Sequence, residues 1–176
     1  MNEEADVRAA RAGDEFARDR LLRALWPRAF RLAAGIVGER TAAEDAAQNA
    51  LIVVATRLHE LREPAAFSSW SARIVVNAAR AVLRRRRNDP PDRPVPSVAF
   101  EELSSQRLDV LAALATLPEW LRVPVVLRYV EDLTSREIGA VLGAPPGTIR
   151  FRLALARRRL AAALNDPAAD CREEFA

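Results

Sequence analysis

Apolar residues recur every three or four positions along most of this chain, and that spacing is typical of amphipathic helices. Half of its 176 residues are apolar, which suffices for a buried core. We therefore predict an all-α protein. The helical pattern covers residues 15–37, 42–61, 70–87, 118–130, 133–142 and 147–164, and it also resumes near residue 100 after a proline-rich stretch.

Local signals indicate where these helices begin and bend. Pro27 lacks a backbone donor and predicts a kink or a break in the first long helix. Thr41, with Glu44 three positions on, predicts the start of the next helix, and Ser68 or Ser69 can cap the one after it. The predicted inner face of the helix that follows Leu117 consists of Leu121, Val125, Val126 and Tyr129.

Residues 133–164 have the pattern of a short helix, a tight turn and a longer basic helix. Thr134 and Glu137 have the spacing of a capping box, and Gly143 can close the first helix. This is the helix-turn-helix arrangement, whose second helix enters the DNA major groove. Period and charge alone leave open that its arginines form only a solvated face. The second helix carries an apolar stripe of Ile149, Leu153, Ala156, Leu160 and Leu164, and off that stripe Arg150, Arg152, Arg157, Arg158 and Arg159.

The charged residues bear on whether this protein binds nucleic acid. The chain has 27 basic and 24 acidic residues, and every basic residue is an arginine. Two explanations account equally well for the exclusive use of arginine, which are the codon bias of a GC-rich genome and bidentate binding of phosphate. The arginines are clustered, however, and clustering is what a nucleic-acid footprint requires.

The sequence lacks the residues that an enzyme or a metal-binding protein would need. The single His59 has no evident catalytic partner, and the sequence has no Gly-rich phosphate loop, so we expect no enzyme and no cofactor. The sequence has a single cysteine, Cys171, so the chain cannot form an internal disulfide. One histidine and one cysteine cannot form a zinc site by themselves, and we expect no metal. Since no apolar run approaches a membrane-spanning length, we expect a soluble cytoplasmic protein without membrane insertion.

The stretch EIGAVLGAPPGTIRFRLALARRRL resembles region 4 of the extracytoplasmic-function sigma factors, which reads E-I-A-x-x-L-x-x-P-x-G-T-V-K-S-R-L-x-R-A-R-x-x-L. The preceding LPEWLRVPVVLRYVEDLT also matches the start of that region. The resemblance implies that this helix-turn-helix binds the −35 promoter element. The residues that it assigns to −35 DNA are Thr148, Arg150, Phe151, Arg152, Leu155 and Arg158.

Two further stretches resemble region 2 of the same family. AEDAAQNAL is similar to A-E-D-x-x-Q-E-x-F, which implies that Glu44, Asp45 and Gln48 bind the β′ clamp helices of core RNA polymerase. On chemistry alone, acids early in a helix also complement the helix dipole. FSSWSARIVVNAA resembles F-x-x-W-L-Y-R-I-A-x-N-x-A, a −10 element site. The residues assigned to −10 DNA are Phe67, Ser68, Arg73, Asn77, Arg80 and Arg84.

These resemblances imply an all-α sigma factor of two small helical domains joined by a Pro-rich linker. The expected partners are core RNA polymerase, through its β′ clamp helices and β flap, promoter DNA and, as is common in the family, an anti-sigma factor. The alternative is a stand-alone helix-turn-helix transcriptional regulator. The expected organisation is a region 2 domain at 1–87, a linker at 88–102, a region 4 domain at 103–164 and a short tail at 165–176.

Overall fold

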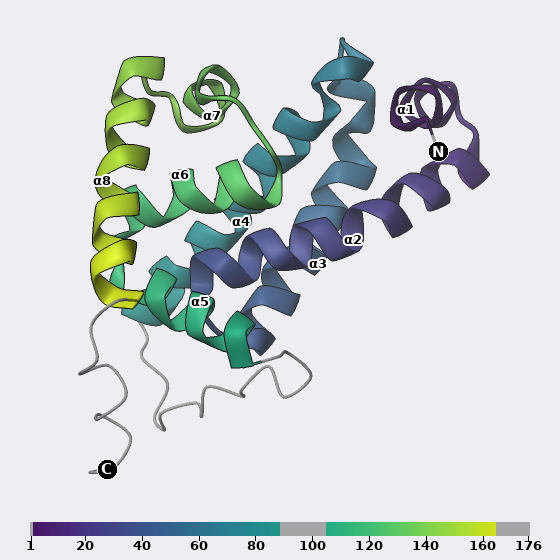
Figure 1. Ribbon diagram of the computed structural model, residues 1–176. Coiled ribbons are helices and arrows are strands. Elements are labelled where there is room, and N and C mark those ends of the chain that lie inside the picture. The colour runs from purple at the N-terminus through teal and green to yellow at the C-terminus, as the bar shows by residue number, and fades with distance from the viewer. Residues whose placement is uncertain (1, 89–104, 165–176) are drawn as a thin grey trace.

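The computed structural model describes the backbone of residues 2–88 and 105–164 and the side chains of residues 2–88 and 109–163. Within these residues the chain is helical and has no strand, which confirms the prediction of an all-α protein (Figure 1). Asn88, the first residue of the predicted linker, is the last residue of α4. The rest of the predicted linker and the predicted tail lie outside the described residues. The helices are α1 (Glu3–Arg11), α2 (Glu15–Val37), α3 (Arg40–Arg57), α4 (Phe67–Asn88), α5 (Ser105–Thr116), α6 (Glu119–Val130), α7 (Ser135–Leu142) and α8 (Pro146–Leu164), and the 3₁₀ turns η1 (Leu58–Glu60) and η2 (Pro64–Ala66) stand between α3 and α4.

The start of α3 differs from the prediction. Glu39, and not Thr41, is the capping residue, because its carboxylate accepts hydrogen bonds from the backbone N–H groups of Thr41 at 2.9 Å and Ala42 at 3.2 Å. Gly38 ends α2 with a φ of 75°, so the chain turns sharply between the two helices. The carboxylate of Glu39 is also paired with Arg86 near the end of α4. This long-range partner holds Glu39 at the helix end, where the local pattern favoured Thr41.

The break that Pro27 predicted as one of two alternatives in α2 is absent. The helix continues through Pro27, whose ring lies exposed to solvent. A proline in a helix interior removes one backbone hydrogen bond and its ring crowds the preceding turn, but the helix around it is packed in the core, where Leu25 and Ala29, two positions to either side of Pro27, are 3% and 1% exposed. Trp26 and Phe30 contribute to that packing, with their ring centroids 6.5 Å apart.

The start of α4 is earlier than the prediction. The turn η2 continues directly into the helix, which begins at Phe67, so neither Ser68 nor Ser69 is its capping residue. Instead, the hydroxyl of Ser69 donates to the carbonyl oxygen of Ala66 at 3.1 Å. Phe67 is 1% exposed and fixes the first turn of α4 to the core.

Helices α2, α3 and α4 pack on one another, and α1 packs against α2; together they form the N-terminal bundle (Figure 1). Arg20 in α2 is paired with Asp6 in α1 at 2.6 Å, which ties α1 to the bundle. The buried face of α3 consists mostly of alanines, and small side chains let neighbouring helices approach closely. These alanines are Ala42, Ala43, Ala46, Ala47 and Ala50.

Helices α7 and α8 form the predicted helix-turn-helix. Thr134 and Glu137 make the predicted capping box, and Gly143 closes α7 with a φ of 67°, as predicted. The turn is tight, because a Cβ added at Gly139 would lie 2.5 Å from the carbonyl oxygen of Ala144. Of the predicted stripe on α8, Ile149, Leu153 and Ala156 are buried and Leu160 is half-buried.

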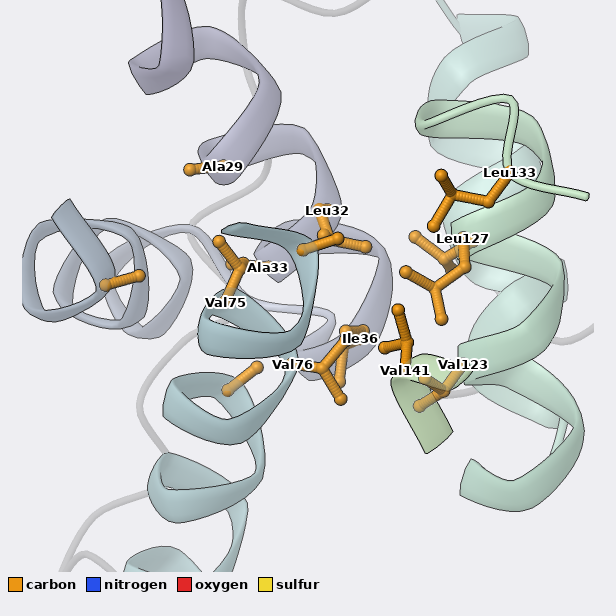
Figure 2. Close-up of a cluster of buried hydrophobic side chains, with 14 of the residues drawn as sticks. Ala29, Leu32, Ala33, Ile36, Val75, Val76, Val123, Leu127, Leu133 and Val141 are labelled. Atoms are coloured by element: carbon orange, nitrogen blue, oxygen red, sulfur yellow. The ribbon is translucent and has the colours of Figure 1, made fainter. Parts of the chain in front are cut away.

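The C-terminal part (α5–α8) packs against the N-terminal bundle, with α2 against α6 and α4 against α7. We call this contact the seam. It forms one continuous hydrophobic cluster (Figure 2). The fit is close where α2 meets α6, because a Cβ added at Gly35 would lie 2.8 Å from Cγ1 of Val126. Labelled members of the cluster are Ala29, Leu32, Ala33 and Ile36 from α2, Val75 and Val76 from α4, Val123 and Leu127 from α6, Leu133, and Val141 from α7.

Candidate protein-binding and nucleic-acid-binding surfaces

The predicted polymerase-binding residues lie on the solvent side of α3, opposite its buried alanines. Asp45 and Gln48 are exposed, and neither has a hydrogen-bond or ion-pair partner among the described residues. Glu44 is half-buried and accepts a hydrogen bond from Arg40 at 3.0 Å. One turn beyond Gln48, Ile52 is 62% exposed. Sequence reasoning missed Ile52, although its position outside the apolar stripe of the helix was a usable signal. The result is an open face with carboxylate, amide and aliphatic groups.

The residues predicted to bind −10 DNA do not share one exposed face. Phe67 is buried, and its ring packs 6.2 Å from that of Trp70, so it cannot reach a base in this conformation. Asn77 and Arg84 are exposed, with no partner in the part of the chain that the structure describes. Ser68 is half-buried, and its hydroxyl accepts a hydrogen bond from Arg28 of α2.

Two arginines of α4 point across the seam. The guanidinium of Arg73 donates a hydrogen bond to the carbonyl oxygen of Ala140 in α7. The Nε of Arg80 donates to the carboxylate of Glu119 in α6 at 2.8 Å. The C-terminal part therefore occupies hydrogen-bonding groups that the sequence assigned to DNA.

Arg28 of α2 is the residue of this site that sequence reasoning missed. It donates to the carboxylates of Glu131 and Glu3, each at 2.6 Å, and to the hydroxyl of Ser68 at 2.5 Å. Burial opposes the charged form of Arg28, but the hydrogen bond and the charge of Glu131 outweigh it and raise the pKa of the guanidinium. Glu131 is 103 positions away, and its side chain is 2% exposed. No local pattern could have indicated this pair.

Helix α8 presents cations and an aromatic ring to solvent. Arg150, Phe151 and Arg158 are exposed, and Phe151 reaches 65% exposure. The other residues predicted to bind −35 DNA, which are Thr148, Arg152 and Leu155, are half-buried. An exposed aromatic ring and arginines on the second helix suit contact with base edges and phosphates.

A second group of arginines converges beside α8. Arg128 from α6 lines a cavity of about 510 Å³ together with Arg150 and Arg157 from α8. Arg128 donates to the hydroxyl of Ser135, the first residue of α7, at 3.0 Å. Tyr129 also lines this cavity and is 63% exposed, so its predicted place on the inner face of α6 is wrong. Three guanidinium groups around one hollow favour an anion such as a phosphate.

Two further properties of the described residues concern metals and membranes. In residues 2–88 and 105–164, no three His, Cys, Asp or Glu residues are grouped so that they could hold a metal ion. Among the helices that the structure describes, none is both long and apolar enough to cross a membrane.

Comparison with known proteins identifies two family models in the chain. Sigma-70 region 2 matches residues 21–88. Sigma-70 region 4 matches residues 107–160. The first match includes α3 and α4, and the second includes α6, α7 and most of α8.

Individual relatives agree with these family matches. The ECF RNA polymerase sigma factor SigM of Mycobacterium tuberculosis is 35% identical over 162 residues, which cover 90% of this chain and 83% of the relative. The ECF RNA polymerase sigma factor SigE of Mycolicibacterium smegmatis is 33% identical over 154 residues, and the match spans 59% of that longer protein. Among solved structures, the sigma factor RpoE of Bartonella quintana, in complex with the anti-sigma factor NepR, superposes with a TM-score of 0.74 over 85% of this chain and 97% of RpoE. At 23% identity, that similarity shows the fold alone.

Proposed function

This chain belongs to the extracytoplasmic-function sigma factors of RNA polymerase. We propose that it acts in transcription initiation through three surfaces, which are the exposed faces of α3, α4 and α8. A sigma factor binds core RNA polymerase and gives it promoter recognition. The observation that carries the assignment is one chain with an open acidic face on α3 and an arginine-bearing helix-turn-helix on the opposite part of the fold. A stand-alone regulator would need only the second.

The α3 face binds core polymerase. Asp45 and Gln48 offer unpaired polar groups, as judged over the described residues, on a helix whose other side is already buried. Ile52 adds an apolar contact one turn away, and a buried apolar anchor beside polar groups is typical of a protein interface. Glu44 contributes less, because Arg40 already neutralises it.

The α8 face binds the −35 element. Among the described residues neither Arg150 nor Arg158 has a hydrogen-bond or ion-pair partner, so both can reach phosphates or guanine edges, and the exposed ring of Phe151 can contact thymine methyl groups. Arg128 and Arg157, beside Arg150, hold the DNA backbone.

The exposed side of α4 binds the −10 element. Asn77 offers both a donor and an acceptor to a base edge, and Arg84 offers a cation to the backbone. Arg73 and Arg80 join them only after they leave their partners in the C-terminal part. Phe67, being buried, anchors α4 instead of contacting a base. The chain binds and performs no covalent chemistry of its own, and it acts in the cytoplasm, where polymerase works.

An anti-sigma factor is a further partner. The solved structure of RpoE that this chain resembles contains the anti-sigma factor NepR. We infer from this similarity of fold that an anti-sigma factor binds this chain as well.

Run-off transcription with purified core polymerase on a promoter library tests the proposed function. Transcripts should appear only when the chain and core polymerase are both present, and the two should comigrate in gel filtration. Asp45→Arg should abolish both results. If the wild-type chain binds a duplex operator but never comigrates with core polymerase, it is a stand-alone regulator and the proposal is wrong.

A further inference from the structure

Two cavities of different chemistry adjoin each other beside α8. The larger one, of about 710 Å³, lies among four helices that contact one another in the ring α2–α5–α8–α6 (Figure 1). The smaller one, of about 510 Å³, lies between α6, the first residue of α7 and α8. Tyr129 and Arg157 line both cavities, so the two hollows share a wall. Each volume falls within the roughly 300–1,000 Å³ that is common for small-molecule sites.

The larger hollow, which we call the apolar cavity, has a hydrocarbon wall. Apart from Arg31 and Arg157, its lining consists of aliphatic, aromatic, alanine and glycine residues. Two members of this lining are left open to solvent, because Val110 is 52% exposed and Tyr129 is 63% exposed. Large apolar side chains exposed together around a hollow are typical of a surface that an apolar group covers. The apolar cavity therefore favours an alkyl chain.

The smaller hollow, which we call the arginine cavity, is cationic. Arg128, Arg150 and Arg157 line it, and among the described residues Arg150 and Arg157 have no hydrogen-bond or ion-pair partner. No Asp or Glu of the described part of the chain lines either cavity. Guanidinium groups pair with phosphate oxygens through charge-assisted hydrogen bonds. A phosphate monoester carries more charge and more acceptor oxygens than a carboxylate, so it suits three arginines better.

We propose that the two cavities together bind a free, single-chain amphiphile with a phosphate head, which is an alkyl phosphate in its simplest form. The alkyl chain fills the apolar cavity, and the phosphate lies among the guanidinium groups of the arginine cavity. Tyr129 and Arg157, which line both hollows, stand where the alkyl chain meets the head. A DNA backbone would account for the arginines alone, because it has no alkyl chain to fill the hollow beside them.

The site has a consequence for promoter binding, and this consequence rests on the proposed function. Arg150 and Arg157 are among the residues that we assign to −35 DNA. A phosphate head that pairs with them removes them from the DNA backbone, so the amphiphile and −35 DNA exclude each other. Asp45 and Gln48 lie on α3, outside both cavities, so binding of core polymerase is unaffected.

Calorimetric titration of the full chain with decyl phosphate, kept below the concentration at which it forms micelles, tests the site. We expect saturable binding of one molecule to each protein. Decanol keeps the alkyl chain without the phosphate, and methyl phosphate keeps the phosphate without the long chain. Each should bind at least about tenfold more weakly than decyl phosphate, because one loses the charge-assisted hydrogen bonds and the other loses the burial of the alkyl chain.

Matched variants on α8 test the two halves of the site. Ala161 and Ala162 are both exposed, but only Ala161 lines the apolar cavity. Ala161→Trp should therefore fill this cavity and weaken binding of decyl phosphate by at least about tenfold, while Ala162→Trp should bind like the wild type. Arg157→Gln should also weaken binding by about tenfold. Its control is Arg159→Gln, at an exposed position outside both cavities. Circular dichroism checks that each variant folds, and the arginine pair decides alone if Ala161→Trp does not.

Competition with DNA is measured on a fluorescent mixed-sequence duplex of about 20 base pairs, because phosphate contacts do not depend on sequence. Decyl phosphate at about ten times its dissociation constant should weaken binding of the duplex to the wild type by about tenfold. Ala161→Trp should bind the duplex like the wild type and lose its response to decyl phosphate.

Several results would overturn the inference. They are an absence of saturable binding, equal binding of decanol or methyl phosphate, equal binding by both members of a variant pair, and a duplex affinity that decyl phosphate leaves unchanged. Binding to vesicles of anionic phospholipid without binding to monomeric decyl phosphate would indicate a membrane surface and would also overturn it. If the chain fails to comigrate with core polymerase, the proposed function is wrong, while calorimetry still decides whether the amphiphile binds.

Discussion

Glu39 links the start of the polymerase-binding helix to the far end of α4, and its removal should be costly. Its carboxylate caps two N–H groups of α3 and pairs with Arg86, and the side chain is 8% exposed. Loss of a cap costs about 1 kcal/mol. Loss of a pair with a partly exposed arginine adds up to about 1 kcal/mol. Glu39→Ala should therefore lower the free energy of unfolding by about 2 kcal/mol, and Glu39→Gln, which keeps a weaker acceptor, by about half of that.

The effect should depend on pH in a defined direction. Burial raises the pKa of Glu39, but Arg86 and the N–H groups of Ala42 and Thr41 outweigh burial and lower the pKa below its ordinary value. A carboxyl whose folded pKa is lowered stabilises the protein above its unfolded pKa, and this contribution is lost as pH falls through the folded value. Urea unfolding at neutral pH should thus separate wild type from Glu39→Gln, and the difference should shrink below about pH 4.3, the ordinary value for Glu. A difference that stays constant under acid conditions would refute the charge-based reasoning, and equal stability of Glu39→Ala and wild type would refute the capping role.

Three further predictions concern the proposed surfaces. Asp45→Arg should abolish comigration with core polymerase while changing the free energy of unfolding by under about 0.5 kcal/mol, as is usual for an exposed site; Asp19→Arg, at an exposed position on α2, should leave comigration intact. Asn77→Ala should slow open-complex formation on duplex promoters, and a pre-melted template should restore only part of the loss; normal rates on duplex DNA would contradict the −10 assignment. Arg150→Ala should weaken −35 binding by about 1–3 kcal/mol at one base position if it reads a base, or equally for all sequences if it binds a phosphate, and unchanged footprints over the −35 region would count against either role.

The sequence predicted best those features that depend on neighbours along the chain. The capping box of Thr134 and Glu137 and the closing Gly143 were predicted correctly, because each is decided within a few residues. The buried stripe on α8 follows from helical period in the same way. Period also predicted the all-α class.

Features that depend on distant residues could not be predicted. Thr41 has a good local capping signal, yet Glu39 caps α3, with Arg86 on a different helix holding its carboxylate. Arg28 pairs with a carboxylate 103 positions away, and no spacing rule reports such a contact. Burial of Phe67 likewise follows from how α4 docks on the bundle, which the apolar pattern leaves undetermined. The assignments of single residues to polymerase and DNA remain predictions.

The hydrophobic cluster at the seam also gives this protein a thermal response. Separation of the two parts would expose apolar side chains such as Ile36, Val123 and Leu127, which are now almost fully buried. Exposure of apolar surface carries a positive heat-capacity change, and the hydrophobic contribution weakens on cooling. The hydrophobic free energy that holds the two parts together should therefore decrease on cooling.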